Sequence, residues 1–362
     1  MRFSRKLATV AIAALAFTGL AAPAASAYNY AYDSDGDRLL DIWEIEGYDY
    51  NGDGYIDIDF PALGADPYHK DIFVEMDYMP GLMASEAELD TIVDTFAQMP
   101  LWNPDGRTGI NLHLDAGSIY PRYDLGGGNQ VPHQGFTNLG DVHDLRAIHS
   151  DIARYRTFHY MIWGDYHGTN GSSGAGNLNG RVFTVTVGPT HWGHASSPIR
   201  IGTFIHELGH NLGLEHGGDD SVNYKPNYTS IMNYKYQLEG LRRSDGSIYY
   251  GYSTSEGMTM NEAAIIETRG IGQQGRGFSI RYGNRYWNAH QGIDFDGDGR
   301  VESRPQRIDI NKDGRISQLS APNDMEMIQF QPQHFFYRNA STVEVNEMTA
   351  DKARDMGYLP AE

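Results

Sequence analysis

The stretch "IRIGTFIHELGHNLGLEH", residues 199–216, decides most of what this sequence says about fold and chemistry. At about 100° per residue, a helix over 199–214 gathers its apolar residues on one side, which we expect to pack on a sheet. Those residues are Ile201, Phe204, Ile205, Leu208 and Leu212. His206 and His210 lie on the other side, one helical turn apart, where two imidazoles can reach one metal ion.

The residues after this helix supply a third candidate ligand. Gly213 can adopt a positive φ and end the helix, so that the chain turns and brings His216 back to the same ion. Three neutral imidazoles suit a tetrahedral zinc and leave one position for water, whose pKa the ion lowers to about 7. We therefore predict one catalytic Zn²⁺ held by His206, His210 and His216. Glu207 is the predicted general base that takes a proton from the zinc-activated water.

Two motifs together resemble a known clan of enzymes. "HELGHNLGLEH" has the HExxHxxGxxH form of the metzincins, a clan of zinc endopeptidases, and "SIMNY" (230–234) resembles their methionine-containing turn. The resemblance implies that Met232 forms a hydrophobic floor below the zinc ligands. It also implies that Tyr234, as in astacin-like and serralysin-like members, ligates zinc at rest and hydrogen-bonds the oxyanion during the reaction.

In outline, residues 69–330 are similar to secreted bacterial metzincin-like proteins that carry EF-hand-like loops. This similarity implies an α+β, metzincin-like fold: a twisted mixed sheet with two long helices in an N-terminal subdomain, then the active-site helix, the methionine turn and a loop-rich C-terminal subdomain. Local patterns agree, because strands alternate with helices first and a loop-rich half follows. We predict strands over 70–79, 110–115, 158–166 and 181–188, a Ser85–Glu88 capping box that starts a helix, and a flexible glycine-rich loop over 168–180.

Acidic loops near both ends predict calcium sites. "DSDGDRLLDIWE" (33–44) places acids at positions 1, 3, 5, 9 and 12 of a twelve-residue loop, as an EF-hand does. Its candidate ligands are Asp33, Asp35, Asp37, Asp41 and Glu44, although Arg38 stands where the pattern expects glycine. The alternative is that these are acidic turns without an ion, because Asp, Asn and Gly form turns on their own account.

Three further loops have the alternating acids but lack an acid at the twelfth position. Their candidate ligands are Asp49, Asn51, Asp53 and Asp57; Asp294, Asp296 and Asp298; and Asp309, Asn311 and Asp313. The missing ligand must then come from elsewhere in the chain. For the last loop Asp324 is a possible distant partner. The number of occupied Ca²⁺ sites is left open.

The composition fits a cation-binding protein outside the cell. The 362 residues include no cysteine, so neither disulfides nor thiolate ligands are available, and calcium would have to stabilise the fold instead. Lys plus Arg is 28 against 47 for Asp plus Glu, a net charge of −19. Such an acidic surface repels nucleic acid and anionic lipid, so we expect neither as a partner.

The N-terminus predicts secretion. "MRFSRK" is basic, "LATVAIAALAFTGLAA" is apolar, and "ASA" ends at Ala27 with the small residues that a signal peptidase reads. A membrane anchor is the alternative, but the apolar run is short and no later stretch is long enough to span a bilayer. We predict a signal peptide over 1–27, a secreted, extracellular protein, and no membrane contact after cleavage.

The remaining chain divides by its motifs. We expect an N-terminal calcium-loop segment over 28–68, a metzincin-like catalytic domain over 69–280 and a second calcium-loop segment over 281–330. Residues 331–362 form a tail, in which "TADKARDMG" predicts a short helix between a Thr349 cap and Gly357.

These patterns predict a secreted zinc metalloendopeptidase that hydrolyses peptide bonds in proteins. Its partner is a protein or peptide substrate, which we expect to pair with an edge strand of the sheet. Two alternatives stay open. One is a non-catalytic, calcium-stabilised extracellular binding or adhesion module that retains a zinc site. The other is a zinc hydrolase that acts on a non-peptide substrate.

Overall fold

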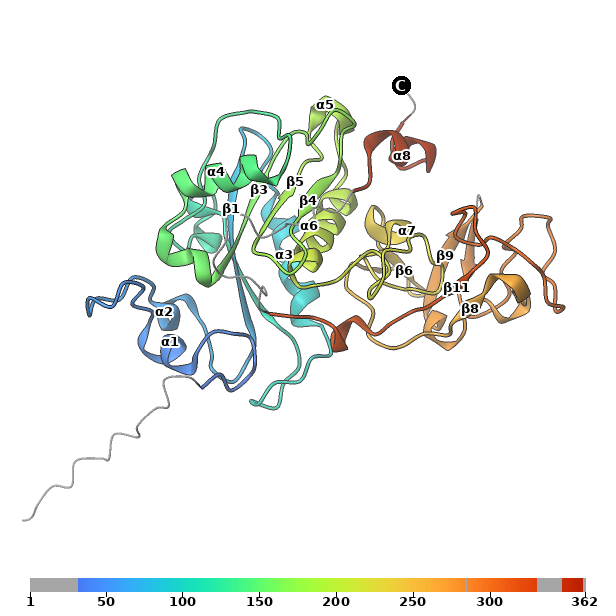
Figure 1. The fold of residues 1–362 in the computed structure, drawn as a ribbon, viewed down its shortest axis with the longest axis horizontal. Coiled ribbons are helices and arrows are strands. Elements are labelled where there is room, and N and C mark those ends of the chain that lie inside the picture. The colour runs from blue at the N-terminus through green and yellow to red at the C-terminus, as the bar shows by residue number, and fades with distance from the viewer. Residues whose placement is uncertain (1–31, 284, 331–346, 361–362) are drawn as a thin grey trace, which may run out of the picture.

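The computed structural model describes residues 32–283, 285–330 and 347–360 (Figure 1). The predicted signal peptide over 1–27 lies outside the described residues. The chain has a mixed α/β fold with several sheets and few helices, which is compatible with the predicted α+β class. Within the described ranges, no helix combines the length and the apolar character needed to cross a membrane.

A five-stranded sheet forms the centre of the N-terminal half, with the strand order β2-β1-β3-β5-β4. Four of its strands are parallel and close to their predicted positions: β1 (Asp71–Tyr78), β2 (Asn111–Asp115), β3 (Phe158–Trp163) and β5 (Val182–Val185). The fifth strand, β4 (Gly174–Gly176), runs antiparallel to β5 and forms one edge of the sheet.

The edge strand β4 lies inside the segment that the sequence predicts to be a flexible loop, so that prediction was wrong here. The glycines that suggested a loop are required by close packing. A Cβ on Gly174 would stand 2.4 Å from Glu207 Oε1, and one on Gly176 would stand 2.9 Å from the backbone oxygen of Glu207. Glycine in a strand marks such a close approach of another element.

Helices cover both faces of this sheet. On one face, α3 (Glu86–Ala97) and α6 (Ser197–Asn211) share a core with Met161 and Trp163 of β3. On the other face, α4 (Leu139–His149) packs against Tyr160 and Ile162 of the same strand. Because successive residues of β3 are buried on opposite faces, its sequence is mostly apolar, interrupted by His159, instead of alternating.

Local signals placed the helix ends correctly. The predicted capping box is present, since Ser85 Oγ accepts a hydrogen bond from Glu88 N (3.4 Å) and Glu88 Oε2 accepts one from Ser85 N (2.8 Å). The predicted C-terminal helix is α8 (Ala350–Asp355). Thr349 Oγ1 accepts from Lys352 N at 3.3 Å and caps it, and Gly357 follows it with a φ of 76°.

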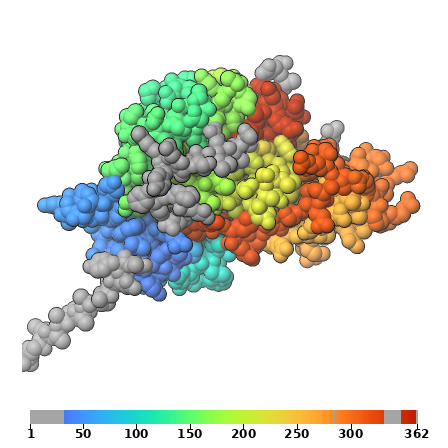
Figure 2. Space-filling model, viewed as in Figure 1, coloured from blue at the N-terminus to red at the C-terminus, as the bar shows by residue number. Residues whose placement is uncertain are grey.

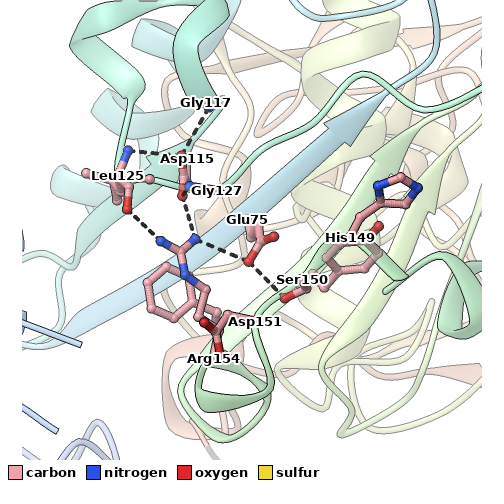
Figure 3. A network of polar contacts seen from close by, with 12 residues as sticks. Glu75, Asp115, Gly117, Leu125, Gly127, His149, Ser150, Asp151 and Arg154 are labelled. Atoms are coloured by element: carbon pink, nitrogen blue, oxygen red, sulfur yellow. Dashed lines mark hydrogen bonds and ion pairs between the residues drawn. The ribbon is translucent and has the colours of Figure 1, made fainter. Parts of the chain in front are cut away.

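A buried ionic network ties the parallel strands to the turn that precedes β3 (Figure 3). Arg154, in a 3₁₀ turn over Ile152–Arg156, lies with Nη1 2.6 Å from Asp115 Oδ2 on β2 and 3.2 Å from Glu75 Oε2 on β1. Ser150 Oγ also donates to Glu75 at 3.0 Å. Breaking a buried pair leaves an uncompensated charge, so this network fixes how the strands meet the turn.

The remaining elements are short, as the predicted loop-rich half requires. A four-stranded antiparallel sheet has the order β10-β9-β6-β7, and β8 pairs with β11. The bounds of these strands are β6 (Leu241–Arg243), β7 (Ile248–Tyr249), β8 (Met260–Asn261), β9 (Phe278–Tyr282), β10 (Arg285–Asn288) and β11 (Gln318–Leu319). The short helices are α1 (Asp41–Glu46), α2 (Phe60–Leu63), α5 (Pro189–Trp192) and α7 (Tyr234–Gln237).

The contact between α6 and α7 depends on Gly202. A Cβ at this position would stand 1.9 Å from the backbone oxygen of Gln237, so Gly202→Ala must push α7 away. We expect this variant to lose about 1–3 kcal/mol of unfolding free energy, measured by urea denaturation. Ser196→Ala is the control, because Ser196 is exposed and its side chain makes no capping hydrogen bond. Equal midpoints for both variants would show that the contact is not tight.

Candidate functional site

Helix α6 presents the residues of the central motif, and its end follows the predicted geometry. His206, Glu207 and His210 are all 0% exposed. Gly213 has a φ of 92°, as predicted. Gly213 N donates to His210 O (3.0 Å) and Leu214 N donates to Gly209 O (2.9 Å), which is the Schellman arrangement that closes a helix. The chain then turns towards the position of His216.

The structure brings the three predicted histidines together and adds a fourth residue, Glu347. Potential ligand atoms of these four residues lie within 4.8 Å of one another. Glu347 Oε2 is 3.0 Å from His206 Nε2, while Oε1 is 3.1 Å from His210 Nε2 and 3.4 Å from His216 Nε2. Its side chain is fully buried. The fourth position, which the sequence assigned to water, is thus taken by a carboxylate of the same chain.

In His206 and His210, the hydrogen bond made by Nδ1 determines that Nε2 faces the cluster. His206 Nδ1 contacts Ile231 O at 3.0 Å and His210 Nδ1 contacts Leu214 O at 2.7 Å. A carbonyl only accepts, so each Nδ1 carries a proton, and in the neutral ring each Nε2 then presents a lone pair. The two Nε2 atoms nevertheless lie 3.2 Å apart. Lone pairs and a carboxylate that face each other in a buried site repel unless a cation lies between them.

The distances between the ligand atoms of the three histidines and Glu347 fit one metal ion bound by all four side chains. Two atoms bound to a tetrahedral zinc at about 2.0–2.1 Å lie about 3.3 Å apart, close to the distances between these four side chains. Burial lowers the pKa of His216 to about 4, so this ring is neutral at pH 7, as a ligand must be. A buried group of three histidines and one glutamate could therefore bind a metal ion.

Tyr234 and Met232 flank this group. Tyr234 begins α7, its hydroxyl donates to Glu347 Oε2 at 3.1 Å, and its ring centroid lies 4.3 Å from that of His216. Burial, followed by the charges of the nearby carboxylates, raises the pKa of Tyr234 well above its usual value, so the phenol keeps its proton. Met232 is 0% exposed and packs on α6, since a Cβ on Gly209 would stand 2.3 Å from its Sδ.

Glu207 does not belong to the metal-binding group among the described residues. Its carboxylate lies against the edge strand, where a Cβ on Gly176 would stand 3.3 Å from Oε2 and one on Gly174 would stand 2.4 Å from Oε1. Glu207 therefore stands beside the cluster, between α6 and β4.

The first acidic loop gathers most of its predicted ligands around a buried carboxylate. Asp33, Asp35 and Asp37 form one group, and Asp37 forms a second with Glu44 and Asp71 of β1. Glu44 is 2% exposed, and neither of its carboxylate oxygens has a hydrogen-bond partner among the described residues. Burial, and then the charge of Asp37, raises the pKa of Glu44 to about 10.

Two details of this loop differ from the sequence prediction. Asp41 lies outside both groups, because its carboxylate accepts hydrogen bonds from Ser34 N (2.7 Å) and Ser34 Oγ (2.8 Å). Asp71 was missed, although an acid at the first residue of a buried strand is a signal that could have indicated it. Its backbone N donates to Asp37 Oδ2 at 2.6 Å, which joins the loop to the central sheet.

The second loop does not gather its predicted ligands. Asp49, Asn51, Asp53 and Asp57 form no metal-sized group in the described part of the chain. The carboxylate of Asp49 instead accepts hydrogen bonds from backbone amides of the same exposed turn, Gly52 N (2.6 Å) and Gly54 N (2.8 Å). This arrangement is that of an acidic turn, the alternative given above.

The third and fourth loops receive acids from the segment that follows β8. Glu267 forms a group with Asp294 and Asp296, whereas Asp298 lies outside it. Glu262 contacts the fourth loop, whose predicted ligands Asp309, Asn311 and Asp313 form no metal-sized group among the described residues. Its Oε1 accepts from Ile310 N (2.7 Å) and its Oε2 accepts from Ser317 N (2.9 Å).

Asp324, the possible distant partner of the fourth loop, makes its hydrogen bonds to other segments instead. Its carboxylate accepts hydrogen bonds from Tyr228 Oη (2.7 Å) and Ser253 N (2.8 Å). Asp324 is 0% exposed and holds neighbouring loops together. Glu262, and not Asp324, contacts the fourth loop. It was missed because it lies far from this loop along the chain.

No model of a protein family matches this chain, and the searches of curated proteins and of solved structures found no match either. The function is therefore inferred from the residues of this chain alone.

Proposed function

We propose that the protein is a secreted zinc-dependent endopeptidase of the metzincin type. The observation that carries the proposal is the set of Nε2 atoms of His206, His210 and His216 around one point, with two rings oriented through backbone carbonyls. Nitrogen ligands in a tetrahedral arrangement favour zinc over the hard cations, which prefer oxygen. Secretion is proposed from the N-terminal sequence alone.

Each neighbouring residue would have one task in peptide hydrolysis. Zinc, when bound, would polarise the substrate carbonyl and lower the pKa of a bound water. Glu207 would accept a proton from the attacking water and pass it to the leaving amine. Tyr234, whose phenol keeps its proton, would donate a hydrogen bond to the oxyanion that develops on the carbonyl. An extended peptide would pair with the edge of the sheet beside β4.

The position of Glu207 favours this function over the two alternatives. A binding or adhesion module that used the metal only for stability would need no buried carboxylate beside the ligands, because such a charge is costly. A hydrolase of non-peptide substrates would keep Glu207 but would have no use for a sheet edge beside the metal-binding group. The binding module and the hydrolase of non-peptide substrates would each be supported by a protein that contains zinc but cleaves no peptide.

Removal of zinc should abolish peptide cleavage. We expect 1,10-phenanthroline to reduce casein hydrolysis to background and added Zn²⁺ to restore it, because the ion polarises the carbonyl and activates the water. The isomer 1,7-phenanthroline cannot chelate and serves as the matched control. The metal content of the purified protein is measured in parallel. Full activity in protein that contains no zinc would contradict the proposal.

We also infer that the first and third acidic loops bind calcium and stabilise the fold. The supporting observation is Glu44, a buried carboxylate that meets Asp37 and Asp71 and whose two oxygens have no hydrogen-bond partner among the described residues. Carboxylate oxygens are the ligands that Ca²⁺ prefers. Glu267 supplies the distant acid that the sequence pattern of the third loop lacks.

A further inference from the structure

We propose that the C-terminal residues 347–350 act as a built-in inhibitor of the metal site, in which Glu347 takes the ligand position that water and substrate require. This inference rests on the proposed function, since it concerns how the same site is regulated. It is carried by the ligand contacts of Glu347, by the backbone pairing of the next residues and by the anchoring of α8.

The first support is the carboxylate itself. Glu347 reaches all three histidines at 3.0–3.4 Å and also accepts the Tyr234 hydroxyl at 3.1 Å. It therefore engages both the ligands and the proposed oxyanion donor. A substrate carbonyl could not reach either while Glu347 is in place, because two groups cannot share one tetrahedral position.

The second support is the backbone that follows Glu347. Residues 348–350 pair antiparallel with the segment that leads into the edge strand β4: Ser172 and Thr349 form a bridge. Ser173 N donates to Met348 O at 2.7 Å, and Ala350 N donates to Gly171 O at 3.0 Å. An extended peptide that adds to a sheet edge makes the same kind of hydrogen bonds, so the tail occupies a place that a substrate would use.

The third support is that α8 is anchored on both sides of the site. Arg354 Nη2 donates to His191 O of α5 at 2.8 Å, and Tyr358 Oη lies 3.4 Å from Lys235 O of α7. Figure 2 shows the red C-terminal residues seated against the green and yellow surface of the chain. A covalently attached ligand acts at an effective concentration of about millimolar, so weak contacts suffice to keep it bound.

The experiment measures access to the metal directly, with acetohydroxamate as the probe. We compare the zinc content and the acetohydroxamate Kd of the full-length wild type, Glu347→Ala and the control Asp355→Ala. Asp355 is an exposed acid at the end of α8. We expect Glu347→Ala to retain zinc and to bind the probe at least tenfold more tightly than wild type, and Asp355→Ala to match wild type. Cobalt-substituted Glu347→Ala should also show a changed visible spectrum.

A second variant keeps every ligand and weakens only the backbone pairing. Ala350→Pro removes the amide that donates to Gly171 O, at the first residue of α8, where proline is well tolerated. Thr349 already has the extended conformation that a following proline requires, with φ −97° and ψ 157°. We expect an intermediate gain in acetohydroxamate affinity, because the tail is released more often.

The outcomes separate the inference from the proposed function. If Glu347→Ala loses its zinc while Ala350→Pro binds the probe like wild type, Glu347 is a permanent ligand and the inference is overturned. Equal probe affinity and equal peptide cleavage in wild type and Glu347→Ala would also overturn it, with the peptidase function intact. Tighter probe binding without any peptide cleavage would support the inference and contradict the peptidase function.

Discussion

Glu207→Gln is expected to lower kcat/KM for peptide hydrolysis by about 10²–10⁴-fold while the protein keeps one zinc per chain. The amide has nearly the same shape as the carboxylate, so it can lie against Gly174 and Gly176 as Glu207 does. It cannot accept the proton of the attacking water. The measurement combines metal analysis with cleavage of a quenched fluorescent peptide.

Glu215→Gln is the matched control for this prediction. Glu215 lies just beyond the helix end, is only half-buried and belongs to no metal-sized group among the described residues. The same chemical change should therefore leave kcat/KM within a factor of about two of wild type, as for a residue that makes no contact with the reaction. If zinc-containing Glu207→Gln cleaves the peptide as fast as this control, Glu207 is not the base.

Removal of calcium should lower the thermal midpoint by roughly 5–10 °C for each occupied loop. An ion that binds only the folded chain at about 1,000 times its Kd contributes about 4 kcal/mol per site. The protein is treated with EDTA and then given back zinc alone, so that any loss of stability reports calcium. An unchanged midpoint would contradict calcium binding at these loops.

Variants of single acids show which loops bind the calcium that raises the thermal midpoint. Glu44→Gln and Glu267→Gln remove one acid each from the first and third loops, and each should abolish part of the calcium-dependent rise in the midpoint. Asp57→Asn changes an acid of the second loop, where no metal-sized group forms in the described part of the chain. This control should respond to calcium as the wild type does.

Local sequence patterns were sufficient to bring together the three histidines of the metal-binding group and to place most helices and strands. His206 and His210 are one turn apart on a helix, and Gly213 returns the chain within a few residues, so the triad depends on short-range geometry. The capping residues Ser85 and Thr349 were found for the same reason, because a cap bonds within one turn.

Contacts between distant segments could not be read from the pattern. Glu347 is 141 residues from His206 in the chain, and Glu262 and Glu267 come to their loops from a separate segment. Nothing in their own neighbourhood marks them, since a single glutamate is usually a solvated surface residue. The strand β4 was missed because glycine, which packing against α6 requires, carries no strand signal.

The glycine composition of β4 also limits what this edge can discriminate. Gly174, Ala175 and Gly176 have no side chain larger than a methyl group, and the two residues before them are serines. A polypeptide aligned here would meet only main-chain donors and acceptors, which every amino acid shares. This edge would then not distinguish one target sequence from another. Selectivity among protein targets would have to come from other parts of the site.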